Sequence, residues 1–249
     1  MGSHYGQFCP VAKAMELLDE RWTLLVVREL MMGSRHFNAL RRGLPRMSPA
    51  LLSKRLQTLV RAGVVERWQD GNRVSYRLSP AGRELEPIVE ALGRWGIRWV
   101  PELGDEDLDP HLLLWDMHRN VDMEAVPDGR TAIAFVFTDV PPSAGRWWLV
   151  ISGDGVDVCD ADPGHPVRVT VEADLRTLIR IWRGDLSWAT ALRSGELLLH
   201  GEEQARRALP RWFTLSTLAA TPRPAVPDPR AEGESGRPVA VAGAGTGRG

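Results

Sequence analysis

Apolar residues recur at helical spacing along the first hundred positions, and short turn-forming segments interrupt them. This pattern predicts three successive helices, over residues 10–33, 34–44 and 48–62. Ser48 followed by Pro49 is a strong start for the third helix, because the serine oxygen caps free backbone N–H groups and proline suits the first turn. Two strand-like runs, VVERWQ and RVSYRL, flank an Asp-Gly turn and predict a β-hairpin. A further helix with one long apolar stripe follows over residues 79–99.

The pattern changes beyond residue 100. The acidic, proline-flanked segment 101–109 predicts a linker between two domains, residues 8–100 and 110–219. In the second domain we expect a helix, four strand-like runs, two helices, a short strand and a last helix. Strands and helices in this order, on one antiparallel sheet, are typical of an α+β domain. Residues 220–249 are rich in Pro, Gly, Ala and Arg without periodicity, which predicts a disordered tail.

The formal net charge of −1 is a cancellation between two unlike parts. Residues 1–100 hold 16 Lys+Arg and 9 Asp+Glu, a net charge of +7, and residues 101–249 hold 15 and 23, a net charge of −8. Within the first part, residues 35–83 hold 11 basic and 2 acidic residues. A basic module joined to an acidic one predicts a polyanion partner for the basic module. The alternative is a solvated basic surface, to which charge runs usually belong.

Three helices followed by a hairpin is the order of a winged helix-turn-helix, whose third helix enters the major groove of double-stranded DNA. A stripe of Leu52, Leu56 and Leu59 would fix this helix to the domain and leave small and polar residues facing outward. Basic side chains would neutralise phosphates, and polar groups would reach base edges or phosphates. The candidate DNA contacts are Arg35, Arg41, Arg42, Arg46, Ser48, Pro49, Ser53, Lys54, Arg55, Gln57, Asn72 and Arg73.

These residues resemble the HxlR-type winged-helix regulators of bacteria over about residues 8–99. The resemblance lies in Cys9-Pro10, Trp22, LRRGLP, LLSKRL and the terminal RWG, which fall in order. It implies a homodimeric transcription regulator that pairs through N-terminal helices and the helix ending in Trp95. The apolar stripe over 85–99, too wide for one small domain to bury, fits that pairing. Two segments depart from the pattern: LDER stands where glycines usually precede the tryptophan, and DGN stands where the wing tip commonly carries prolines.

In this family a cysteine near the start sometimes senses oxidants by bonding across the dimer, so Cys9 is a redox candidate. The alternative is a small apolar residue beside a proline helix start, since no basic neighbour in sequence favours a reactive thiolate.

The second domain resembles a sterol-carrier-type domain over roughly residues 110–218. The similarity lies in a strand, a helix ending in RGD, an ALRSGELLLHG turn into the last strand and a closing helix. It implies a five-stranded sheet with helices around an apolar cavity for a hydrophobic or aromatic effector. Aromatic walls suit such a ligand, and the candidate ligand-binding residues are Trp115, Trp148, Trp182, Trp188 and Trp212. Two alternatives stay open: these tryptophans fill an ordinary core, or the domain serves only dimerisation or protein interaction.

We expect no enzyme activity, cofactor or metal site. The histidines are scattered, no cysteine or histidine pair has metal-ligand spacing, and no nucleophile-elbow motif occurs. No apolar run approaches the roughly 20 residues of a membrane helix, so we expect no membrane partner. Two cysteines and no secretory signal predict a cytoplasmic protein.

Overall fold

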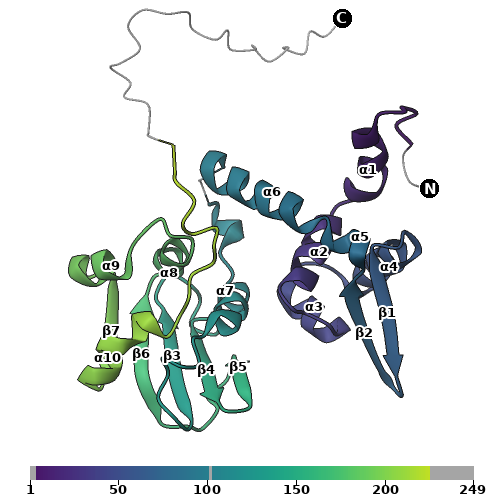
Figure 1. Ribbon diagram of the computed structural model, residues 1–249. Coiled ribbons are helices and arrows are strands. Elements are labelled where there is room, and N and C mark those ends of the chain that lie inside the picture. Colours follow the sequence, from purple (N-terminus) through teal and green to yellow (C-terminus); the bar gives the residue numbers. More distant parts are fainter. Residues whose placement is uncertain (1–3, 101–102, 225–249) are drawn as a thin grey trace, which may run out of the picture.

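The computed structural model describes residues 4–100 and 103–224, which form two domains (Figure 1). The N-terminal domain contains α1 (Pro10–Leu18), α2 (Thr23–Met31), α3 (Phe37–Gly43), α4 (Pro49–Arg61), β1 (Val65–Asp70), β2 (Arg73–Leu78), α5 (Pro80–Arg83) and α6 (Glu86–Trp99). The C-terminal domain contains α7 (Pro110–Met117), β3 (Thr131–Phe137), β4 (Arg146–Ser152), β5 (Gly155–Cys159), β6 (Val167–Ala173), α8 (Leu175–Trp182), α9 (Trp188–Ser194), β7 (Leu197–Gly201) and α10 (Glu203–Ala208). Short 3-10 turns precede α7 (η1, Asp105–Asp107) and follow α7 and α10 (η2, His118–Asn120; η3, Leu209–Arg211).

Helix α4 forms where the capping signal places it. The Ser48 side chain accepts a hydrogen bond from the Leu51 backbone N–H at 3.3 Å, which satisfies a free donor of the first turn. Leu52, Leu56 and Leu59 are buried in the core of the N-terminal domain. The β1–β2 hairpin follows in antiparallel register, so the helices and wing that the pattern predicts are present.

The prediction of one helical run over residues 10–33 is wrong, because the chain forms two helices there. Between α1 and α2 the backbone turns, and Trp22 adopts the left-handed region with a φ of 78°. Arg55 of α4 holds this turn: its Nε donates to the Arg21 carbonyl at 3.1 Å, and its guanidinium pairs with Glu20. Apolar spacing continues through the turn, so the periodicity of the sequence does not reveal the break.

The C-terminal sheet has the strand order β5-β4-β3-β6-β7. Its neighbouring pairs are antiparallel except β3 and β6, which run parallel with Phe135 opposite Val171. The expectation of a purely antiparallel sheet is therefore wrong, because the chain crosses back from the edge strand β5 to the far side of β3. Alternation of apolar residues marks a strand but not its direction.

Alternate residues of β3 and β4 point toward the helices of this domain. Ile133, Phe135 and Leu149 share one buried cluster with Leu178 of α8 and Trp212. Figure 1 shows α8, α9 and α10 beside the sheet, and α7 on the side that faces the N-terminal domain. The observed architecture is an α+β domain with a five-stranded sheet.

The last helix, which the sequence predicts over residues 202–218, is shorter in the structure, where α10 ends at Ala208. After α10 and η3 the chain extends, and the Trp212 carbonyl accepts a hydrogen bond from Asp122 N at 2.8 Å. The described chain continues to residue 224, beyond the predicted start of the disordered tail at residue 220. In this stretch Arg223 pairs with Asp185 at 2.5 Å. The remainder of the predicted tail, residues 225–249, lies outside the described residues.

Candidate nucleic-acid interface and the domain junction

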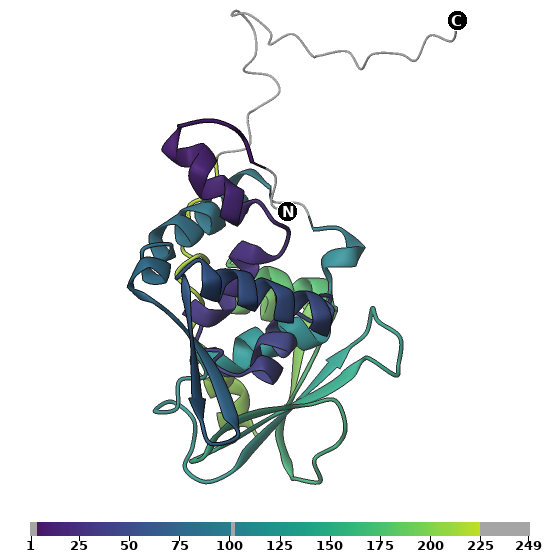
Figure 2. The same cartoon turned by 90° about the vertical axis from the view of Figure 1, so that its right-hand side faces the viewer.

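Helix α4 offers small and polar groups to solvent on the face opposite its leucine stripe. Among the predicted contacts, Ser53 is half-buried, and the exposed ones are Ser48, Pro49, Lys54 and Gln57. The β1–β2 hairpin extends from the same domain (Figure 2), and Asn72 and Arg73 are exposed at its turn. A helix of this composition beside a hairpin can contact a groove and the flanking phosphate backbone.

Arg55 does not face outward as expected. It is buried, and its guanidinium is occupied by Glu20 and by the Arg21 carbonyl. A charge held this way cannot also neutralise a phosphate, so Arg55 is a structural residue of the α1–α2 turn. The adjacent Lys54 is exposed, because a step of one residue along a helix rotates the side chain to another face.

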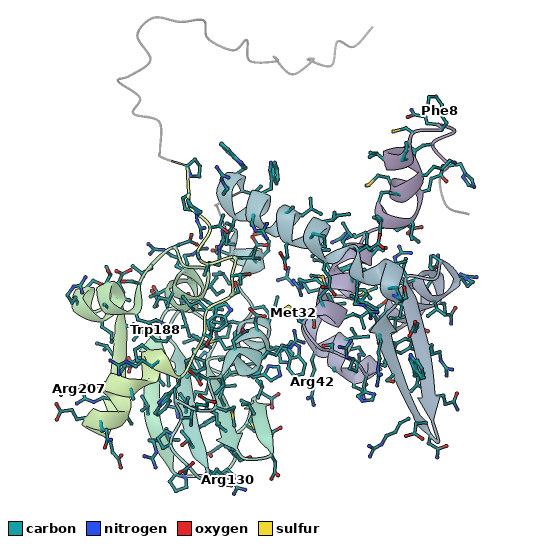
Figure 3. All side chains as sticks on the ribbon, viewed as in Figure 1. Phe8, Met32, Arg42, Arg130, Trp188 and Arg207 are labelled. Carbon is teal, nitrogen blue, oxygen red and sulfur yellow. The ribbon has the colours of Figure 1, made fainter. Side chains whose placement is uncertain are left out.

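The predicted arginines around α3 differ in what they contact. Arg41 is exposed. Arg42 lies over the Trp115 ring of α7, 5.5 Å from its centroid, and Figure 3 shows Arg42 at the junction between the domains. Arg46 donates to the Glu106 carbonyl of η1, and Arg35 donates to the Leu30 carbonyl at 3.4 Å. Two of these four side chains therefore connect the helix-turn-helix to the C-terminal half.

A buried ion cluster joins the domains, and no pattern in the sequence predicts it. Glu29 of α2 is 1% exposed, and its carboxylate accepts from Arg28 at 2.8 Å and from Ser34 at 3.1 Å. Arg119, from the C-terminal domain, donates to the same carboxylate at 2.7 Å and to the Ser34 hydroxyl at 2.8 Å. Burial would raise the pKa of Glu29, but the guanidinium groups of Arg119 and Arg28 outweigh burial and hold that pKa below its ordinary value.

This cluster also explains the glycine at the end of α3. A Cβ on Gly43 would lie 1.9 Å from the Glu29 carboxylate, so only glycine leaves room for the buried anion. The helix-turn-helix is thus built around an acid that the other domain helps to neutralise.

Trp115 lies between two cations at the same junction. The Arg119 and Arg42 guanidinium groups are 5.0 and 5.5 Å from its ring centroid. His118 packs on the same ring at 4.2 Å, and burial, with the charge of Arg119, lowers the pKa of His118 to about 4. Burial raises the pKa of the neighbouring Asp116, which accepts a 2.6 Å hydrogen bond from the Trp182 Nε1.

The five tryptophans predicted to bind a ligand do not surround one cavity. Trp115 belongs to the domain junction, and Trp182 is a buried, hydrogen-bonded core residue. Trp188 stacks on Phe213 at 6.5 Å. Trp147 pairs with the core residue Phe135 and packs against the core, so Trp148 points to the opposite face of the sheet and is not brought together with Trp182 or Trp212.

Trp212 differs from the other four because it lines a cleft of about 450 Å³ between residues 124–128 and α10. Its side chain is 0% exposed, and its Nε1 meets no acceptor within residues 4–100 and 103–224. A buried donor without an acceptor is uncommon in folded proteins.

Both cysteines are half-buried free thiols. Cys9 precedes α1 at its N-terminus, beside the fully exposed Phe8, and its redox role stays a prediction. Burial, followed by Asp157 and Asp160, raises the pKa of Cys159. The described part of the chain holds no group of three or more His, Cys, Asp or Glu side chains placed to bind a metal, and no helix long and apolar enough to cross a membrane.

Comparisons with known proteins concern mainly the N-terminal domain. A family model described as HxlR-like helix-turn-helix matches residues 17–103. An uncharacterized HTH-type transcriptional regulator of Mycobacterium tuberculosis is 41% identical over 104 residues, covering 40% of this chain and 64% of that protein. The regulator YvaP of Bacillus subtilis is 35% identical over 98 residues, covering 38% of this chain and 91% of that protein. A solved structure of the redox regulator HypR in its oxidized form is 30% identical, covers 36% of this chain and 95% of that one, and gives a TM-score of 0.34.

The helices and hairpin of the first domain define a winged helix-turn-helix protein. Because the chain matches nearly all of YvaP at 35% identity, it belongs to the HxlR-like helix-turn-helix family. The chain spans about two thirds, 64%, of the length of its mycobacterial relatives, and its C-terminal domain lies beyond the matched region.

Proposed function

We propose that this protein is a DNA-binding transcriptional regulator in which α4 enters the major groove and the hairpin contacts the flanking backbone. The observation that supports this most is the outward face of α4, where Lys54 and Gln57 are exposed beside the half-buried Ser53. This face belongs to a segment, residues 35–83, with 11 basic and 2 acidic residues. Electrostatic attraction to phosphates and polar contacts to bases are the two terms that DNA binding requires.

The test is the salt dependence of binding to a duplex that covers the region upstream of the gene for this protein. Lys54→Ala should reduce the slope of log affinity against log salt by about 0.9 for each bound chain, and so by about 1.8 for a dimer, because each chain loses one phosphate contact. Lys13→Ala is the matched control, since Lys13 is an exposed lysine on α1 that pairs with Glu16, and it should leave the slope unchanged. Absence of any salt-sensitive binding to this duplex would contradict the proposal.

The regulator acts as a homodimer through α1 and α6. Phe8, Trp95 and Trp99 are 99%, 58% and 57% exposed, and Figure 3 shows Phe8 at the free end of α1, away from both domains. Ile88 and Leu92 extend the same apolar stripe along α6. Monomeric proteins rarely leave so contiguous an apolar surface in water, whereas a two-fold pairing of identical stripes would cover it.

The C-terminal domain binds a hydrophobic small-molecule effector that biases DNA binding. Support comes from the cleft between residues 124–128 and α10, which the buried Trp212 completes with its unpartnered Nε1. Titration with apolar polycyclic compounds should quench tryptophan fluorescence, and Trp212→Phe should weaken that binding, while Trp68→Phe on the wing should not. If no compound alters the fluorescence, the domain is an interaction module instead.

A further inference from the structure

A second cleft, of about 180 Å³, lies between the two domains. Its apolar walls come from both sides of the junction: Trp22, Leu25, Leu44 and Pro45 from the winged-helix domain, and Leu112 from α7. A cavity of about 150 Å³ in another protein holds benzene, so this space suits a molecule of about one ring rather than a lipid or a nucleotide.

Arg28 supplies this cleft with a polar group. Its Nη2 donates to Glu29 at 2.8 Å and to the Gly43 carbonyl at 3.3 Å. Its Nε is buried and has no acceptor among the residues that the structure describes. Burial also closes the Nε to a bound molecule, but the Arg28 side chain as a whole is 35% exposed, so an oxygen in the cleft can accept from the outer part of its guanidinium group.

Three carboxylates line the edge of the cleft: those of Asp107 and Asp109 already have partners, and that of Glu106 is exposed. Asp107 accepts from the Gly104 backbone N–H at 2.9 Å, and Asp109 caps α7 by accepting from the Leu112 N–H at 3.1 Å. They stabilise the chain around the cleft, whereas the partly exposed guanidinium group of Arg28 can still donate to a ligand.

The cleft adjoins the segment that sets the recognition helix. Residues 43–46 line it, and they connect α3 to α4. Arg46 ties this connection to the other domain through the Glu106 carbonyl. Trp22, on the opposite wall, is the one non-glycine residue with a positive φ in the described chain, and such strained backbone is concentrated at ligand clamps and switches.

We propose that this cleft binds a compact apolar molecule of about one ring that carries a carbonyl or carboxylate oxygen, which accepts from the partly exposed Arg28 guanidinium group. The occupant touches the connection between α3 and α4 and the strained turn at Trp22 together. Binding itself needs no DNA, and only its consequence for DNA affinity rests on the proposed function.

Three probes of similar size test the site on the full chain by calorimetry or ligand-observed NMR. Acetophenone carries a neutral carbonyl, phenylacetate carries a carboxylate, and ethylbenzene carries no acceptor. At least one of the first two should bind with one site per chain and about tenfold tighter than ethylbenzene, because only they carry an acceptor for the Arg28 guanidinium group. Which of the two binds more tightly tells whether the natural ligand is neutral or anionic.

Two variants locate the binding. Leu25→Trp places a larger side chain in the cleft at a position that is 41% exposed, and it should abolish binding; Leu192→Trp, at a 37% exposed position on α9, is the matched control and should not. Arg28→Lys keeps a positive charge beside Glu29 but removes the planar guanidinium donors, so it should weaken the preferred carbonyl probe about tenfold and leave ethylbenzene unchanged.

The site is disproved if neither carbonyl probe binds, if ethylbenzene binds equally well, or if Leu25→Trp leaves binding intact. Gel shifts with and without the bound probe are a separate measurement. Failure of every gel shift would contradict the DNA-binding proposal and leave the calorimetric result standing.

Discussion

The winged-helix domain has two contact faces of opposite chemistry. The face toward the C-terminal domain is covered, and its centre is polar: Arg119 reaches the buried Glu29, and Arg42 lies over Trp115. The face formed by α1 and α6 is apolar, and its tryptophans Trp95 and Trp99 are uncovered.

The difference reflects what each contact must supply. The two domains are held at high effective concentration by the chain, so their junction can use directional ion pairs that fix geometry and add little net free energy. A contact with a second copy has no such tether, and buried apolar area must supply its affinity. A polar junction with few alternative geometries also suits transmission of a signal between domains.

The largest expected effect comes from charging the uncovered face. Trp95→Glu should convert the proposed dimer into a monomer in analytical ultracentrifugation, because two identical charges would meet across a two-fold axis. Loss of bivalent attachment should weaken operator binding on the order of 10²-fold. Trp68→Glu is the control, since Trp68 is 54% exposed on the wing, and this variant should stay dimeric. A dimeric Trp95→Glu protein would place the pairing surface elsewhere.

Breaking the covered face should have a smaller but clear effect. Arg119→Met leaves the Glu29 carboxylate buried with only Arg28 and Ser34 as partners, which should cost about 3 kcal/mol of stability. Hydrogen exchange of the α2 backbone amides measures this loss of stability at the site of the change. A local measurement is needed because a two-domain protein does not unfold in a single transition.

Two further variants identify the cause of that loss. Arg168→Met removes an exposed pair with Glu202 and should cost less than 1 kcal/mol. Arg119→Met combined with Glu29→Leu should recover most of the loss, because no buried charge then remains. If the double variant is as unstable as Arg119→Met, packing rather than charge holds the junction.

The sequence predicted the elements whose signals are local. Ser48-Pro49 fixed the start of α4, and the Asp-Gly turn fixed the hairpin, because a cap or a turn depends on neighbours within a few residues. The break at Trp22 was missed because it depends on Arg55, more than thirty residues away. Only the strand register decides which of the adjacent residues Trp147 and Trp148 points toward the core.

The candidate site divides in the same way. Exposure of Lys54 and Gln57 follows from helical spacing relative to the leucine stripe. Glu29 and Arg119 are 90 positions apart in the chain. From the sequence alone, each looks like an ordinary charged residue on a helix surface. A buried ion pair between domains therefore has no pattern that composition or periodicity can detect.

The effect of pH on stability should be smaller than the effect of Arg119→Met, and it tests the electrostatics of the junction between the domains. The pKa of His118 falls to about 4 in the folded chain, so between pH 6.5 and 4 the unfolded chain binds a proton that the folded chain does not. Stability should therefore decline as pH falls through this range. The slope is at most about 1.4 kcal/mol per pH unit and less here, because the ring is only half-buried and solvent screens it.

A matched variant isolates this contribution from that of Asp116. The raised pKa of Asp116 acts in the opposite sense, since its contribution to stability is lost as pH rises through the folded value. His118→Gln keeps a polar side chain and removes the titration, so subtracting its pH profile from that of the parent leaves the His118 term. A flat difference between pH 4 and 6.5 would show that His118 titrates normally.

The smallest expected effect separates two adjacent arginines of α3 that sequence alone treats as equivalent. Arg41 is exposed, whereas Arg42 lies on Trp115 of the other domain. Arg41→Ala should lower the salt slope of DNA binding by about 0.9 for each bound chain. Arg42→Ala should leave most of that slope and instead cost about 0.5 kcal/mol at the junction, as expected for an exposed cation–π contact. Anisotropy titrations at several salt concentrations measure the slopes. An equal loss of slope in both variants would mean that Arg42 leaves Trp115 to contact DNA. The covered face and the DNA-binding face would then compete for the same side chain.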